Sequence, residues 1–230
     1  EQLYALGALN DRGELTKRGR RMAEFPMDPQ LSKMLLASET EGVSSEVLSI
    51  AAMLQIGASV FYRPKERALH ADAARANFRA SAGDHLTLLN VWERWRETDF
   101  SAQWCYDNFV QVRSMRKARD LREQLAQLME RVEIEHRSDP ANIDGICKAV
   151  TAGFFYHTAR WQATLEYRTV KHPQTVHIHP SSVLAGDAHP RWVVYHELVF
   201  TSKEYMRQLV EIKPQWLVEL APHFYKTEDV

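Results

Sequence analysis

The sequence predicts an α+β protein in which a helical region, covering roughly the first two-thirds of the chain, is followed by a small antiparallel β-barrel. Two observations support this prediction. Up to about residue 152, apolar residues recur at spacings of three and four, as they do on one face of a helix. Residues 175–200 instead alternate apolar with polar residues or gather β-branched and aromatic ones, and glycine- and proline-containing turns separate these pieces.

The first two expected helices are marked by apolar stripes at helical spacing. Gly42 ends the first stripe, and Ser44 or Ser45 is expected to cap the second helix because a serine hydroxyl can accept from a free backbone N–H. The stripes consist of Leu31, Met34 and Leu35, and of Val47, Ile50, Ala51 and Leu54. Pro64 then interrupts the helical pattern and favours extended backbone at Arg63.

A third helix is expected to begin near Asp84, which stands where an N-cap belongs. Its apolar positions, at i, i+3, i+4 and i+7, are Leu88, Val91, Trp92 and Trp95. A polar stretch containing Pro140 is expected to close the helical region, and one more helix is expected from Ile143 to about Ala152.

The expected strands differ in their burial. Around residues 175–179, Val176 and Ile178 point to one side, while His177 and His179 point to the other. The run WVVYHELVF, residues 192–200, is long enough and apolar enough for a strand buried in part on both faces. Two histidines on one face of a strand can bind zinc, but no third ligand is evident, so we favour ordinary polar strand positions and predict no metal site.

The most unusual segment is a basic helix that follows several aromatic residues. Between residues 113 and 122 it carries five cations against one anion, Asp120, although the net charge of the whole chain is −1. The cations are Arg113, Arg116, Lys117, Arg119 and Arg122. Cations beside aromatics suit a polyanion with exposed bases. The alternative is a solvated helix face, in which Arg119 and Arg122 pair with Asp120 and Glu123 or with a neighbouring domain.

Other kinds of function are disfavoured by missing motifs. The sequence contains neither a GxxxxGK[ST] phosphate loop nor a DEAH-type acidic motif, so we expect no ATP hydrolysis by these residues and predict no cofactor. No apolar run approaches the ~20 residues that cross a bilayer, and no signal peptide is expected. Cys105 and Cys147 lack metal-ligand spacing and are expected to be buried as small hydrophobic residues. The opening residues look like the middle of a helix, so we expect a piece of a longer protein.

Eight sequence blocks resemble, in the same order, the C-terminal region of DEAH-box RNA helicases. They are LYALGALN (3–10), LTKRGRRMAEFPMDPQLSKMLLAS (15–38), FYRPK (61–65), GDHLTLLNVW (83–92), GFFYHTARW (153–161), VHIHPSSVL (176–184), WVVYHELVFTSKEYMR (192–207) and WLVELAPHFY (216–225). The basic segment RSMRKARDLREQL (113–125), followed by FFYHTAR, is most similar to the spliceosomal pre-mRNA-splicing ATPase that acts before the first splicing step.

The resemblance implies a domain organisation and a role. Residues 1–24 would be the end of a winged-helix domain, 25–138 a helical ratchet (HA2) domain, and 139–230 an OB-fold domain. Such a region grips single-stranded pre-mRNA and regulates the helicase without catalysing a reaction itself. ATP and magnesium would belong to motor domains outside these residues. The implied partners are those motor domains, a glycine-rich G-patch activator that would find only part of its surface here, and spliceosomal proteins, all in the nucleus.

OB folds bind oligonucleotides through one barrel face and its loops. The resemblance therefore indicates RNA-binding residues on the barrel and in the helical part. On the barrel they are Tyr156, His157, Arg160, Lys171, Ser181 and Ser182, and in the helical part they are Arg63, Lys65, Arg113 and Arg116. Each has a structural alternative: Tyr156 can belong to the core, and Ser181 can cap a turn.

A second hypothesis assigns the chain no RNA at all. In it, the helical part is a protein-interaction module whose basic helix contacts an acidic partner. Six tryptophans are present, and Trp92, Trp95 and Trp104 could then be binding anchors, although aromatics at helical spacing are more often core residues. Oligonucleotide binding that saturates and weakens with salt favours the first hypothesis, and indifference to RNA favours the second.

Overall fold

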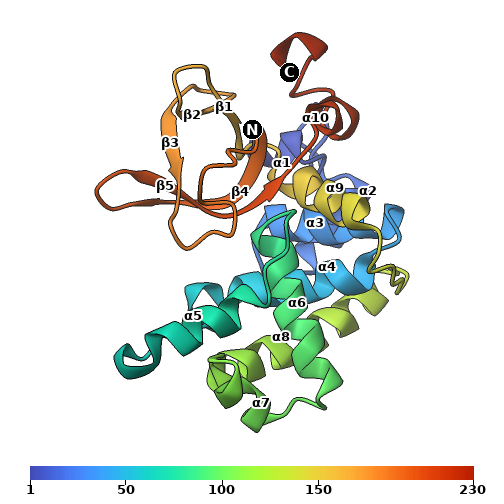
Figure 1. Cartoon of the computed structure of the whole chain (residues 1–230). Helices are drawn as coiled ribbons and strands as arrows, with labels where there is room; N and C mark the ends of the chain where they lie inside the picture. The colour runs from blue at the N-terminus through green and yellow to red at the C-terminus, as the bar shows by residue number, and fades with distance from the viewer.

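Helix α3 (Pro29–Thr40) and helix α9 (Ile143–Phe154), far apart in the sequence, pack against each other near the middle of the molecule (Figure 1). The computed structural model describes residues 1–230, apart from the side chain of Ala58. A Cβ atom at Gly153 would lie 2.3 Å from the carbonyl oxygen of Gln30, so this close approach requires a glycine. The expected helix from Ile143 is confirmed and extends two residues further than predicted, to Phe154.

The remaining helices extend from this pair, and helix α4 packs against α3, α6 and α8. The helices are α1 (Gln2–Ala5), α2 (Lys17–Ala23), α4 (Ser44–Gln55), α5 (Ala68–Ala76), α6 (Asp84–Glu97), α7 (Ala102–Asp107) and α8 (Val112–Arg131), with 3₁₀ turns η1 (Gly57–Val60) and η2 (Lys65–Arg67). The predicted end of α3 is confirmed, because the chain leaves the helix through Gly42 with φ +71°.

The strands form a closed five-stranded barrel in the order β1-β2-β3-β5-β4. They are β1 (Thr158–Trp161), β2 (Tyr167–Thr169), β3 (Thr175–Ile178), β4 (Trp192–Phe200) and β5 (Glu204–Glu211). The pairs are antiparallel except β3–β5, which is parallel. Helix α10 (Pro214–Leu220) and the 3₁₀ turn η3 (Thr227–Asp229) follow and return the chain to α9. The predicted α+β class, helices followed by an OB-type barrel, is confirmed.

Burial within the barrel follows the predicted pattern. Val176 is fully buried and Ile178 packs against the barrel core. The first four residues of β4 are all buried, as expected for a strand covered on both faces, whereas its second half is exposed and forms a hairpin with β5. Cys105 and Cys147 are buried, and burial raises their thiol pKa values to about 11 and about 12. In the described part of the chain, no helix combines the length and the apolar character needed to cross a membrane.

The predicted cap of α4 is wrong. Ser44 and Ser45 are the first residues of the helix, and Val43 holds the N-cap position without a side-chain hydrogen bond. The Ser44 hydroxyl instead donates to the carbonyl of Glu135 at 2.7 Å and accepts from the N–H of Arg137 at 2.8 Å. The reason is a tertiary contact. The polar connection before α9 crosses the start of α4, and its backbone groups, rather than those of the helix, form the hydrogen bonds of this hydroxyl.

Asp84 is also not the N-cap that the sequence predicts. Gly83 holds that position with φ +135°, and a Cβ there would lie 2.2 Å from the Leu209 carbonyl oxygen of β5. The buried Asp84 carboxylate faces the barrel instead, where it accepts from Ser182 Oγ (2.5 Å), from the Val183 N–H (2.9 Å) and from the Leu209 N–H (2.9 Å). Burial raises the pKa of Asp84, while these hydrogen bonds oppose the rise. Asp84 therefore fastens the barrel to α6.

We expect Asp84→Asn to destabilise the protein by about 1–3 kcal/mol. Asparagine keeps one acceptor oxygen but replaces the other with an NH₂ group, so at least one buried donor of the barrel loses its partner. Urea unfolding followed by circular dichroism measures the loss. Asp120→Asn, at an exposed position of α8, is the control and should change stability by less than ~0.5 kcal/mol. Equal stability of the two variants would show that the carboxylate does not fasten the barrel.

His85, the next residue of α6, should make stability depend on pH. Its ring is fully buried, neither ring nitrogen has a hydrogen-bond partner among the described residues, and burial lowers its pKa from 6.5 to about 3. The unfolded chain therefore binds this proton first as the pH falls, and stability is lost between about pH 6.5 and 3.

We expect His85→Leu to flatten the pH dependence of the unfolding free energy by up to about 1.4 kcal/mol per pH unit below pH 6. Urea titrations at pH 7 and pH 5 measure this slope. The exposed His136→Leu is the control and should leave the slope unchanged. A wild-type slope in His85→Leu would contradict the assignment.

Candidate nucleic-acid interface

A cleft lies at the junction of the helical part and the barrel, and we call it the junction cleft. It is bordered by η1, α5, α6, β5 and the loop that follows β3. Its lining includes Phe61, Arg75, Asp84, Ser181, Ser182 and Arg207. Because Asp84 holds α6 against the barrel, the two walls of the cleft are fixed relative to each other.

Arg75 enters the cleft from the last turn of α5. Its guanidinium lies over the ring of Phe61, 4.6 Å from the ring centroid, and its Nη2 donates to the Ser181 carbonyl at 3.0 Å. Burial lowers the pKa of Arg75, and the nearby charge of Asp84 opposes this effect. An arginine stays protonated at neutral pH and carries five N–H donors, so donors remain available for a ligand.

The outer surface of β3 and β5 adjoins the cleft. His177 pairs in register with Tyr205, and the ring of His179 lies edge-on to Tyr205 with centroids 5.5 Å apart. Burial and the nearby charge of Arg207 lower the pKa of His179. Nη1 of Arg207 lies 4.0 Å from Oε1 of Glu197, and the two side chains make a weak ion pair. We call His177, His179, Tyr205 and Arg207 the barrel face.

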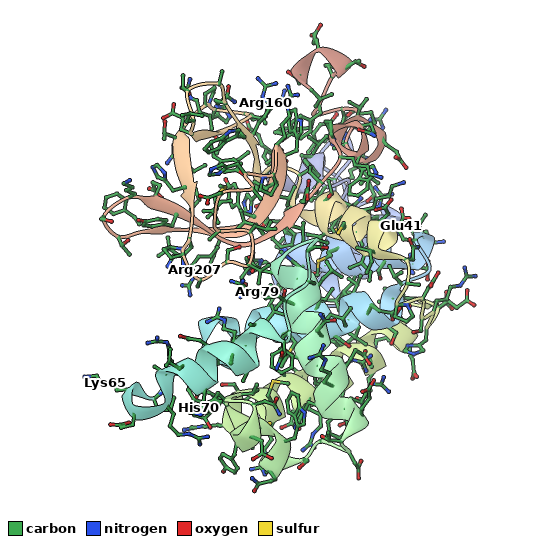
Figure 2. All side chains as sticks on the ribbon, in the orientation of Figure 1. Glu41, Lys65, His70, Arg79, Arg160 and Arg207 are labelled. Atoms are coloured by element: carbon green, nitrogen blue, oxygen red, sulfur yellow. The ribbon has the colours of Figure 1, made fainter. Side chains whose placement is uncertain are left out.

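Further basic side chains lie before, on and after α5. Figure 2 shows Arg79 and Arg207 near each other in that view at the junction, with His70 and Lys65 further towards the free end of the helix. The pKa of Arg75, lowered mainly by burial, is lowered further by the charge of Arg79. The junction therefore concentrates positive charge from two separate segments of the chain.

This arrangement suits a single-stranded nucleic acid. Arginine side chains can donate to phosphate oxygens, and the histidine and tyrosine rings of the barrel face can stack on bases. Among the described residues, no group of three or more His, Cys, Asp and Glu side chains is placed to hold a metal ion. The chemistry that the site offers is binding of an anionic, planar ligand.

Two of the residues predicted from the sequence, Ser181 and Ser182, line the junction cleft, and two more, Arg63 and Lys65, lie on the segment before α5. Ser181 is exposed beside Arg75, and its hydroxyl is 2.7 Å from Nδ1 of His179. Ser182 is buried, and its hydroxyl donates to Asp84, so it positions the loop. Arg63 and Lys65 precede α5 and are exposed; Arg63 makes a two-point ion pair with Asp72, at 2.8 and 2.9 Å. Direct RNA contact by these residues stays a prediction.

The basic helix α8 divides into two groups of cations. Arg113 and Arg116 are exposed, as predicted for RNA-binding residues, but no nucleic-acid contact tests them. Arg119 and Arg122 do not pair with Asp120 and Glu123. The guanidinium of Arg119 lies 5.7 Å from the Trp95 ring centroid, and that of Arg122 lies 5.5 Å from the Trp92 ring centroid.

The tryptophans of α6 are core residues and not exposed anchors. Trp92 is 2% exposed and Trp95 is 0% exposed, and their rings meet edge to face with centroids 5.7 Å apart. Trp104 is partly buried and packs against Phe78. This finding removes the main support for the hypothesis of a tryptophan-anchored protein-interaction module.

The other four predicted residues lie away from the junction cleft, towards the C-terminal segment. Arg160 is labelled at the opposite end of the barrel from Arg207 in Figure 2. Tyr156 packs on Phe224, with ring centroids 4.2 Å apart, and Lys171 makes an ion pair with Asp229 at 3.1 Å. Both ring nitrogens of His157 have partners within the protein, namely the carbonyl of Tyr195 and the side chain of Gln30.

Sequence reasoning missed Arg75, Arg79, Tyr205 and Arg207. One signal was available in the sequence: side chains of a strand alternate between its two faces, so Tyr205 and Arg207, two residues apart, lie on one face of β5. No signal within the sequence brings α5 to this face, because residues about 130 positions apart meet there only through the tertiary fold.

The fold consists of a helical part and an OB-type barrel, and the surface at their junction suits an anionic, planar ligand. In a comparison with protein families, three segments of the chain match known domains. Residues 1–27 match the winged-helix part of the helicase-associated domain HA2, residues 28–88 match its ratchet-like part, and residues 146–225 match the oligonucleotide/oligosaccharide-binding (OB) fold. These are the domains of the C-terminal region of DEAH/RHA helicases, in this order, and no motor domain is among them.

We expect Arg122→Met to destabilise the protein by about 1–3 kcal/mol. Its guanidinium donates to Ser49 Oγ at 2.8 Å and to the carbonyl and hydroxyl of Ser45, both at 3.2 Å, so the substitution removes a network between α8 and α4. Arg113→Met, on the exposed side of the same helix, is the matched control and should cost less than ~0.5 kcal/mol. Chemical denaturation distinguishes them, and equal losses would contradict the division of the basic helix.

Proposed function

We propose that this chain is the non-catalytic, RNA-gripping and regulatory C-terminal region of an ATP-dependent DEAH-box RNA helicase that acts in pre-mRNA splicing. In this proposal, single-stranded RNA lies along the junction cleft and the barrel face. The observation that carries the proposal is the convergence of Arg75 from α5 and Arg207 from β5 on one cleft, beside partly exposed His179 and Tyr205. The three matched domains support the helicase assignment.

The expected contacts explain how such a region would work. Arginines that bind phosphates hold RNA without reading its sequence, as a translocating enzyme requires. Because Asp84 fixes the barrel to α6, the two walls of the cleft would move as one body when the motor domains open and close. The motor domains would supply ATP, magnesium and the second wall of the RNA path, so the isolated region should bind RNA weakly, at micromolar concentrations or above.

Several partners belong to the same proposal. The similarity of residues 113–125 to a spliceosomal member underlies the assignment to splicing, a nuclear location and contacts with spliceosomal proteins. A G-patch activator would meet only part of its surface in residues 1–27, where Leu3 and Tyr4 are 41% and 48% exposed. Binding of a G-patch peptide to this chain alone should therefore be partial.

We expect Arg75→Glu with Arg207→Glu to weaken binding of single-stranded RNA by about tenfold or more, because two phosphate contacts become repulsive. Fluorescence anisotropy with labelled polyuridine at low and physiological salt measures the affinity. Wild-type binding should itself weaken steeply as salt rises.

Arg12→Glu with Arg20→Glu is the matched control. It makes the same change in net charge at exposed positions of the winged-helix part, and it should leave the affinity nearly unchanged. Circular dichroism establishes that both variants fold. If both double variants weaken RNA binding equally, the loss of affinity is due to the change in net charge and not to the cleft. If the protein binds acidic peptides but not RNA, the protein-interaction hypothesis is supported.

A further inference from the structure

A second group of cations lies on the barrel away from the junction cleft. Arg160 of β1 and Arg168 of β2 are paired directly across the two strands, and both line a hollow together with Asp229. Like charges that face each other across a strand pair repel unless an anion lies between or beside them. Among the described residues, no carboxylate makes an ion pair with either arginine.

The C-terminal segment brings an anion to this hollow. Asp229 ends the 3₁₀ turn η3, and its carboxylate accepts from the N–H of Lys226 at 2.7 Å and from Nζ of Lys171 at 3.1 Å. The hydrogen bond from Lys226, followed by that from Lys171, lowers the pKa of Asp229. Asp229 is therefore the acidic side chain that lines the hollow with Arg160 and Arg168, and its ion pair is with Lys171 and not with either arginine.

Partly exposed aromatic rings lie beside Lys171, the partner of Asp229. Lys171 lies 5.3 Å from the ring centroid of Phe224, and Phe224 packs against Tyr156 with ring centroids 4.2 Å apart. Neither ring is fully covered. Cations beside exposed aromatic edges fit a phosphate with its attached base better than they fit an acidic protein side chain, which has no planar group to stack.

We propose that this hollow is a second RNA-binding site, for a phosphate of a single strand, and that Asp229 occupies it as a competing anion until RNA displaces the η3 turn. This inference rests on the proposed RNA-binding function and adds a second contact and a regulatory element to it. In the free protein Lys171 pairs with Asp229, and in the complex Lys171, Arg160 and Arg168 would bind the phosphate.

The contact with Asp229 is weak enough to be displaced. The side chains of Lys171 and Asp229 are 29% and 28% exposed, and ion pairs of this kind contribute little to stability. Removing the charge of Asp229 should therefore tighten RNA binding by about two- to fivefold, the factor that corresponds to a pair of this strength.

Asp229→Asn is the direct test. Asparagine keeps an oxygen that can accept from the N–H of Lys226, so the turn is preserved while the charge is removed. Glu228→Gln is the matched control, because it removes an exposed charge from the neighbouring position and changes the net charge equally. In anisotropy titrations with labelled polyuridine, Asp229→Asn should bind about two- to fivefold more tightly than wild type, and Glu228→Gln should not. The gain should vanish when Arg160→Glu and Arg168→Glu are added.

A second readout separates this inference from the junction cleft. Inorganic pyrophosphate is titrated into the ¹⁵N-labelled protein while the amide resonance of Lys226, which donates to Asp229, is followed by NMR. We expect a saturable shift of this resonance in wild type and in Arg75→Glu/Arg207→Glu, and none in Arg160→Glu/Arg168→Glu. If the cleft variant loses RNA binding no more than its control does, while Lys226 still responds, the proposed RNA path fails and the anion site stands.

Two results would overturn the second site. In the first, Asp229→Asn and Glu228→Gln bind polyuridine equally well. In the second, pyrophosphate leaves the Lys226 resonance in place or shifts it equally in Arg160→Glu/Arg168→Glu. Either result would mean that Asp229 only fastens the C-terminal segment to the barrel.

Discussion

The arrangement of the molecule depends on one buried carboxylate. Asp84 accepts hydrogen bonds from Ser182, Val183 and Leu209, so the start of α6, the loop after β3 and the middle of β5 meet at a single side chain. A buried carboxylate is tolerated only when such donors offset its lost hydration. The backbone takes part as well, because the N–H of Glu211 donates to the carbonyl of Ala82 beside it. The cleft between Arg75 and Arg207 exists because this junction holds its two walls together.

Local patterns in the sequence predict the elements well and the contacts between them poorly. The stripe of α3, the stop at Gly42 and the burial of Val176 follow from short-range rules of helix and strand geometry. Ser44 and Asp84 satisfy the local rule for an N-cap equally well, yet the side chains of both form hydrogen bonds with segments that are distant in the sequence. A polar side chain at the start of a helix can serve the helix or a tertiary partner, and sequence spacing alone does not distinguish these uses.

In the candidate site, too, the local sequence predicts the elements but not the contacts between them. Charge density along residues 113–122 correctly marks an unusual helix, but the roles of its cations depend on which aromatic rings lie next to them. Arg122 covers Trp92 and holds α8 to α4, whereas Arg113 faces solvent. The junction cleft is not predictable from any one stretch, because Arg75 and Arg207 come together only after the barrel has closed and docked. Residues of an interface formed by two separate segments carry no common signal in the sequence.

The packing of α3 against α9 also constrains the order of events during synthesis. The face of α3 that packs on α9 stays uncovered until residues 143–154 have left the ribosome. The Asp84 carboxylate likewise lacks its last donor until Leu209 has followed. The ring of His223 is hydrogen-bonded to the carbonyl of Ala5, which joins the two ends of this region. Folding dominated by such distant contacts is slow, and it leaves apolar helix faces exposed on the nascent chain. The apolar faces of the helical part are therefore fully covered only after the barrel has been synthesised.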